Sequence, residues 1–141
     1  MADGGPMPLA IDASVAFKWF VPEDGRDRAL ALLDGDEPLW APDLVLAEVG
    51  NALFGRLRTM SEGRDVAATS VRALSEIYSR LVPARELVPR ALEIAFDLRH
   101  PIYDCVYLAM CEMHDIVLIT ADQRLIAAAD GTPHSSRLRI L

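Results

Sequence analysis

Hydrophobic residues follow two patterns along this chain: short continuous runs, and longer stretches in which apolar residues recur every three or four positions. Apolar runs of roughly four to eight residues are typical of buried strands, and the longer period is typical of helices with one apolar face. The pattern predicts strands at 8–12, 39–41, 81–83, 116–120 and 138–141. It predicts helices at 14–20, 28–33, 42–57, 61–77, 90–98, 102–114 and 122–129.

This alternation of strands and helices predicts the fold class. Strands that are apolar throughout, such as 116–120, are typical of a parallel sheet covered by helices on both faces. We therefore expect an α/β protein, and a length of 141 residues favours a single domain over 1–141. In such sheets the functional crevice lies beyond the carboxyl ends of the strands. Asp12 and Asp122 occupy such positions, each directly after or close to a predicted strand.

The excess of acidic over basic residues argues against some classes of function. Acidic residues outnumber basic ones by 21 to 14, and the formal net charge is −7. Proteins that hold nucleic acid on a broad basic face bind by neutralising phosphates, so this composition argues against that class. Carboxylates gathered around divalent cations would present a much less negative surface, so a metal-dependent nucleic-acid site remains compatible with the charge.

The hydrophobic runs and the two cysteines bear on the cellular location of the protein and on whether it forms a disulfide. No apolar run approaches the roughly 20 residues that span a bilayer, and the first residues lack the basic start and apolar core of a signal peptide. We expect a cytoplasmic protein with no membrane association. Cys105 and Cys111 lie six positions apart in one predicted helix, so we expect no disulfide between them.

Two further acids lie within predicted helices. Glu48 shares a helix face with small or uncharged residues, and Asp104 shares one with Tyr107. An ionised carboxylate in such a setting loses hydration unless a cation or a hydrogen-bond donor compensates. Convergence of Glu48 and Asp104 with Asp12 and Asp122 would create a cluster of oxygen ligands, which suits Mg²⁺ or Mn²⁺ better than zinc. The natural chemistry of such a site is metal-assisted phosphoester hydrolysis.

Each acid, taken alone, also has a structural interpretation. Asp12 and Asp122 would serve as turn or helix-cap residues. Glu48 would be a helix-surface acid, and Asp104 a favourable charge in the first turn of its helix. Spacing alone therefore leaves the function open.

Four groups of residues occur in order along nearly the whole chain and together favour one interpretation. They are Ile11-Asp12-Ala13-Ser14 with Lys18-Trp19-Phe20; Ala41-Pro42-Asp43-Leu44 with Glu48-Val49-Gly50-Asn51-Ala52-Leu53; Tyr103-Asp104 with Tyr107-Leu108-Ala109; and Leu118-Ile119-Thr120-Ala121-Asp122. In this combination the chain resembles the PIN-domain family, and in particular the VapC toxins of bacterial type II toxin–antitoxin pairs.

The resemblance implies a three-layer α/β/α fold with a central, mainly parallel sheet of about four or five strands. It also implies an endoribonuclease that depends on Mg²⁺ or Mn²⁺. The residues that would bind metal and orient the attacking water are Asp12, Glu48, Asp104 and Asp122. Ser14 and Thr120 match hydroxyl positions that support the acids, Asn51 matches an amide at the edge of the site, and a helix-cap role for Ser14 stays open.

The same resemblance implies partners. They are an RNA substrate, a second copy of the chain in a homodimer, and a VapB-like antitoxin that can place an arginine near the acidic pocket; an acidic toxin surface suits such a partner. The alternative is a catalytically silent PIN-fold binding module, and cleavage of DNA also stays open. The RNA target and the number of ions do not follow from the sequence.

We expect structural or solvent-exposed roles, rather than functional ones, for the histidine and arginine residues outside these motifs. The three histidines form no zinc pattern, and we expect solvent or capping roles for His100, His114 and His134. Three arginines lie in or near the helix that carries Glu48, and contact with RNA phosphate is less favoured for them than simple solvation. These are Arg56, Arg58 and Arg64.

Overall fold

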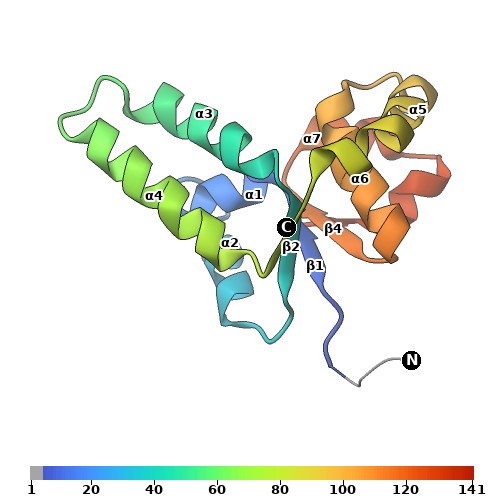
Figure 1. The fold of residues 1–141 in the computed structure, drawn as a ribbon, viewed down its shortest axis with the longest axis horizontal. Coiled ribbons are helices and arrows are strands. Elements are labelled where there is room, and N and C mark those ends of the chain that lie inside the picture. The colour runs from blue at the N-terminus through green and yellow to red at the C-terminus, as the bar shows by residue number, and fades with distance from the viewer. Residues whose placement is uncertain (1–4) are drawn as a thin grey trace.

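A five-stranded parallel sheet forms the centre of the molecule in the computed structural model, which describes residues 5–141 (Figure 1). The strands lie in the order β3-β2-β1-β4-β5, and all four neighbouring pairs are parallel. Their bounds are β1 Leu9–Ile11, β2 Leu39–Pro42, β3 Arg80–Val82, β4 Val117–Thr120 and β5 Leu138–Ile140. The predicted α/β class and parallel sheet are confirmed.

Helices cover both faces of this sheet, with α1 to α4 on one side and α5 to α7 on the other (Figure 1). The chain moves outward from β1 through β2 to β3, and then crosses back to β4 and β5. Since crossovers between parallel strands are right-handed, the reversal of direction sends the later helices to the opposite face. The bounds are α1 Ala13–Ala16, α2 Arg26–Ala31, α3 Val45–Leu57, α4 Gly63–Ile77, α5 Val88–Leu98, α6 Ile102–His114 and α7 Gln123–Ala129.

Helix α6 is the main packing element of the second face. Every residue from 105 to 111 is buried, because the helix contacts β2 and β4 on one side and α5 on the other. A helix that is enclosed in this way is apolar all round, and α6 accordingly lacks a polar stripe in its middle. Only its two ends reach solvent, and its N-terminal end carries Asp104.

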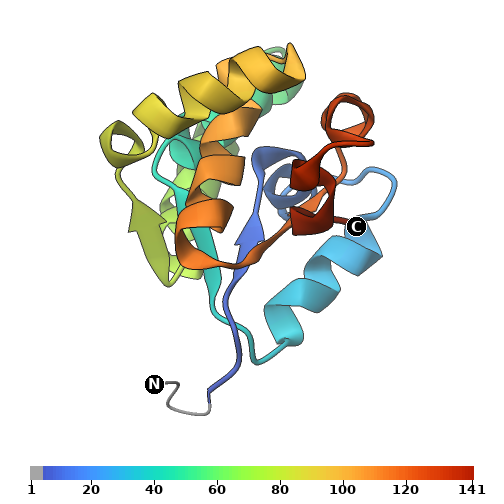
Figure 2. The same cartoon turned by 90° about the vertical axis from the view of Figure 1, so that its right-hand side faces the viewer.

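The register of the sheet brings the ends of β1 and β4 together. Strand β1 runs between β2 and β4 (Figure 2), and Ile11 is paired with Ile119. The amide of Asp12 continues this ladder by donating to the Ile119 carbonyl at 3.4 Å. Asp12 and Thr120 therefore meet at the carboxyl edge of the sheet, where α3 and α6 also begin.

Every predicted helix and strand is present, but several bounds differ. The helix predicted at 14–20 is only the four-residue α1 followed by a 3₁₀ turn, Phe17–Trp19. Pro22 restricts the residue before it to extended conformations, so the helix cannot continue. The helix predicted from residue 61 starts at Gly63, because Glu62 has a left-handed backbone with φ of 64°.

Two other sequence predictions can be compared with the structure. Cys105 and Cys111 are both buried free thiols, as predicted. Within residues 5–141, no helix has the length and apolar character needed to cross a membrane.

Candidate active site

Asp12, Glu48, Asp104 and Asp122 line one cleft of about 150 Å³ at the carboxyl edge of the sheet. Asp12 follows β1 directly, Glu48 lies in the first turn of α3, Asp104 lies in the first turn of α6, and Asp122 joins β4 to α7. The cleft is completed by Ala13, Ser14 and Tyr107, so no lysine or arginine is among the described residues that line it.

Asp12 is the most deeply buried of the four acids, with 3% of its surface exposed. Its Oδ1 accepts hydrogen bonds from the Ser14 hydroxyl at 2.6 Å and the Val15 amide at 3.2 Å, and its Oδ2 accepts one from the Thr120 hydroxyl at 2.5 Å. Burial nevertheless raises the pKa of Asp12 to about 6, because these donors offset only part of the lost hydration. The folded protein therefore holds a poorly solvated carboxylate.

Glu48 is held from the opposite wall of the cleft. The buried Tyr107 hydroxyl on α6 donates to Glu48 Oε1 at 2.8 Å. Desolvation raises the pKa of Glu48 to about 7, and the charges of Asp104 and Asp12 act in the same direction. Tyr107 opposes this shift, so it holds the carboxylate in place and favours its ionised form.

Asp104 and Asp122 form the third side of the cleft. Burial and the neighbouring Asp122 carboxylate raise the pKa of Asp104, while a contact with His100 lowers it. Asp122 Oδ1 accepts the amides of Arg124 and Leu125 at 2.9 and 3.4 Å, so it caps α7 as its structural interpretation predicted. The Asp122 side chain therefore caps α7 and lines the cleft at the same time.

The three predicted supporting residues differ in position. Thr120 is fully buried and contacts Asp12, and its Oγ1 also accepts the Asp122 amide at 3.0 Å. Ser14 is not the cap of α1, because Asp12 takes that role; Ser14 instead bonds Asp12 and accepts the Ala121 amide at 3.0 Å. Asn51 is exposed on α3 and does not line the cleft, so its supporting role stays a prediction.

The donor set of the cleft fits a hard divalent cation. Four carboxylates share one poorly hydrated cleft, and the pKa values of Asp12, Glu48 and Asp104 are raised, so a cation would relieve both desolvation and mutual repulsion. Within residues 5–141, no three His, Cys, Asp or Glu side chains are grouped closely enough to hold one ion by themselves. This is compatible with Mg²⁺, which keeps several waters and uses one or two carboxylates.

His100 lies against this site, contrary to its predicted solvent or capping role. Its Nε2 is 2.5 Å from Asp104 Oδ2. The sequence carried a signal that was missed, because four positions separate the two residues, and Tyr107 follows Asp104 by three. Such spacings bring side chains together at a helix end. His114 instead packs edge-on against Trp40.

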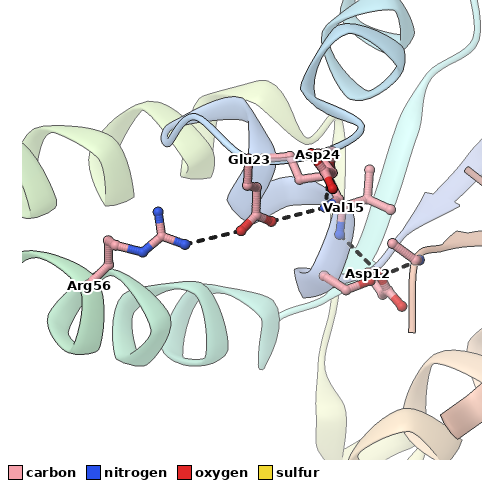
Figure 3. A network of polar contacts seen from close by, with 8 residues as sticks. Asp12, Val15, Glu23, Asp24 and Arg56 are labelled. Atoms are coloured by element: carbon pink, nitrogen blue, oxygen red, sulfur yellow. Dashed lines mark hydrogen bonds and ion pairs between the residues drawn. The ribbon is translucent and has the colours of Figure 1, made fainter. Parts of the chain in front are cut away.

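Arg56 is engaged within the chain. It reaches from α3 to Glu23 with a 3.2 Å ion pair (Figure 3). Its guanidinium also lies 5.3 Å from the centre of the Phe17 ring. Glu23 binds Lys18 as well, at 3.0 Å. The charge of Arg56, one of the three arginines considered for RNA contact, is therefore already partly neutralised by Glu23.

Comparison with known proteins agrees with the geometry. A family model described as the PIN domain matches residues 9–131. The chain belongs to the PIN-domain family. Ribonuclease VapC1 of Mycobacterium tuberculosis is 35% identical over 100 residues, which is 70% of this chain and 72% of the relative. Ribonuclease VapC3 of Pyrobaculum aerophilum is 28% identical over 121 residues, which is 84% and 92% of the two chains.

Solved structures support the same PIN fold. VapBC2 from Rickettsia felis, bound to a DNA fragment from its promoter, superposes with a TM-score of 0.67 at 12% identity, covering 96% of this chain and 99% of that one. A toxin–antitoxin complex from Klebsiella pneumoniae gives a TM-score of 0.61 at 13% identity, covering 94% and 95%. At such identities the likeness concerns the fold alone.

Proposed function

We propose that this PIN domain is a Mg²⁺- or Mn²⁺-dependent endoribonuclease and the toxin component of a type II toxin–antitoxin system. The observation that carries the proposal is the convergence of Asp12, Glu48, Asp104 and Asp122 on one cleft without a lysine or arginine in its lining. The relatives named ribonuclease VapC support RNA as the substrate.

The residues of the chain have distinct tasks in this reaction. The four acids would hold the metal, which when bound activates water and stabilises the leaving oxygen of the phosphodiester. Ser14 and Thr120 fix both oxygens of Asp12, so that carboxylate cannot rotate away from the cleft. Tyr107 fixes Oε1 of Glu48 and leaves Oε2 for the cleft. The protein thus supplies a preorganised set of oxygen ligands.

We also propose an antitoxin partner and a homodimer. The neighbouring structures that are toxin–antitoxin complexes support the first, and an acidic cleft matches an arginine from such a partner. Neighbouring exposed apolar side chains on α5 support a further interface, since soluble monomers rarely expose large contiguous apolar patches. Leu92 and Phe96, with exposed fractions of 50% and 78%, line one surface groove together with Ala95.

The deciding experiment is cleavage of total RNA by purified protein with Mg²⁺ or Mn²⁺. We compare wild type with Asp12→Asn and Asp104→Asn, with EDTA, and with Asp97→Asn as a matched change at an exposed acid on α5. The proposal expects products with 5′-phosphate ends that vanish in both cleft variants and in EDTA but persist in Asp97→Asn. Equal activity in all samples would indicate a contaminating nuclease and reject the assigned site.

A silent binding module is the second candidate. The two candidates differ in metal affinity, because a ligand that binds only the folded state raises the melting temperature. A nuclease site should give such a rise with Mn²⁺ that Asp104→Asn abolishes, whereas a silent module should give none.

A further inference from the structure

His100 occupies the junction between α5 and α6 and faces the acidic cleft from outside its lining. Its side chain is 9% exposed, and its Nε2 lies 2.5 Å from Asp104 Oδ2. No other histidine of residues 5–141 has a hydrogen bond to one of the four acids. The contact is therefore a specific feature of this corner of the site.

The backbone on both sides fixes where His100 lies. Arg99 ends α5 in a left-handed conformation with φ of 53°, and the His100 amide donates to the Ala95 carbonyl at 3.1 Å. Pro101 follows and caps the start of α6, which disfavours a helical backbone at His100. The imidazole is thus placed by a helix end, a proline and a helix start rather than by a flexible loop.

Asp104 has a particular need for a donor. The neighbouring Asp122 carboxylate raises the pKa of Asp104, and the Asp104 charge in turn raises the pKa of Asp12. A carboxylate on the first turn of a helix can rotate about its side-chain bonds, and repulsion from a like charge favours rotation away. A donor on the far side of Asp104 counteracts that tendency.

We propose that His100 is a positioning residue for Asp104, donating from Nε2–H to Oδ2 and so holding the carboxylate in the orientation in which it would bind a metal in the cleft. This inference rests on the proposed metal-dependent nuclease. The role requires only a proton on Nε2, which both the neutral Nε2–H tautomer and the imidazolium carry. Groups that orient metal-binding side chains in this way commonly affect metal affinity nearly as much as the ligands do.

Mn²⁺ binding to the metal-free protein, measured by calorimetry, tests the role without relying on activity. His100→Phe keeps the ring but removes the donor, and we expect an affinity about 10–100-fold weaker. His100→Gln keeps an amide donor near the place of Nε2, and we expect it to recover most of the affinity. His134→Phe is the matched control, because His134 lies in the 3₁₀ turn Pro133–Arg137, away from the cleft lining, and its affinity should equal that of wild type.

The outcomes separate the two proposals. Wild-type affinity in His100→Phe, together with lost binding in Asp104→Asn, overturns the positioning role and leaves the nuclease assignment intact. Absence of Mn²⁺ binding in wild type overturns both. Should His100→Phe fail to fold, the ¹⁵N spectrum of the wild-type histidines decides: a protonated Nε2 on His100 supports the role, and a bare Nε2 overturns it.

Discussion

The Thr120 hydroxyl donates to Asp12 Oδ2 at 2.5 Å, although 108 positions separate the two residues. Thr120 Oγ1 in turn accepts a hydrogen bond from the amide of Asp122 at 3.0 Å. One buried side chain therefore ties the acid after β1 to the acid after β4. The position of two cleft carboxylates thus depends on a hydroxyl that carries no charge.

Thr120→Val should expose this dependence. Valine has a similar shape but no donor, so Asp12 loses a hydrogen bond and its pKa rises further. We expect the free energy of unfolding to fall by about 1–3 kcal/mol, and the pH at which Mn²⁺ binding is half complete to move upward. Denaturant titration and calorimetry between pH 5 and 8 measure the two effects.

A second threonine provides the control for that experiment. The Thr132 hydroxyl donates to the Ala129 carbonyl at 2.6 Å and accepts the His134 amide, and Thr132 lies outside the cleft lining. Thr132→Val should lower stability without changing the pH profile of Mn²⁺ binding. Identical profiles for both variants would refute the role of Thr120.

Two buried tyrosines allow another matched comparison. Tyr107 donates to Glu48 and Tyr78 donates to the Ile11 carbonyl, both at 2.8 Å. Each Tyr→Phe change should cost about 1 kcal/mol of stability, because each leaves one buried acceptor without its donor. Only Tyr107→Phe should also weaken Mn²⁺ binding near pH 6, since only it removes a donor from a carboxylate. Equal Mn²⁺ affinity in the two variants would contradict this assignment.

The raised pKa of Glu48 predicts how stability varies with pH. In the metal-free folded protein the pKa is about 7, against 4.5 for an ordinary glutamate, so the folded state holds its proton more tightly than the unfolded chain. Stability from this group is then complete below about pH 4.5 and is lost as pH rises through 7. Asp12, with a pKa of about 6, acts in the same direction.

Glu48→Gln should remove its share of this pH dependence. We expect the melting temperature of metal-free wild type to fall by several degrees between pH 5 and 8, and that of the variant to fall less. Saturating Mg²⁺ should restore the melting temperature of the wild type at pH 8, because it favours the ionised form of Glu48. It should restore that of the variant to a smaller extent. A wild-type melting temperature that rises over this range would refute the prediction.

The ion pair of Arg56 with Glu23 should matter little for stability. The Arg56 side chain is 43% exposed and the Glu23 side chain is 27% exposed, so solvent screens the pair. We expect Arg56→Gln to lower the free energy of unfolding by less than about 1 kcal/mol. RNA cleavage should keep nearly the wild-type rate, measured against Arg64→Gln, whose side chain is exposed on α4. A large loss specific to Arg56→Gln would indicate that it contacts RNA.

The sequence predicts the architecture well because the apolar strands and the helical period are strong local signals. It predicts helix starts less well, because α4 begins only at Gly63, after the left-handed backbone of Glu62. A side chain at position 63 would clash with the backbone of Leu57. That close approach between consecutive helices depends on their packing, which no local pattern reveals.

The acids of the cleft and the hydroxyls of Ser14 and Thr120 can be proposed from motif positions, but two other partners of the acids cannot. The sequence predicts a solvent or capping role for His100 because the histidines form no zinc pattern, yet His100 contacts Asp104 from the turn before α6. Tyr107 was noted only as a neighbour on the same helix face, although it bonds Glu48 on the opposite side of the cleft. The Tyr107 contact depends on how α3 and α6 approach each other, which is a property of the tertiary structure, whereas the His100 contact is local and depends on the turn between α5 and α6.

The wide spacing of the cleft acids along the chain has a consequence for synthesis of the protein. Asp12 emerges early and Asp122 late, and the β1 to β4 pairing that joins them cannot form until both strands exist. Under the proposed function, a chain in which β4 has not yet joined the sheet carries an incomplete set of ligands. We expect such a chain to be inactive as a nuclease, and activity to begin only once the strand that precedes the last acid has joined the sheet.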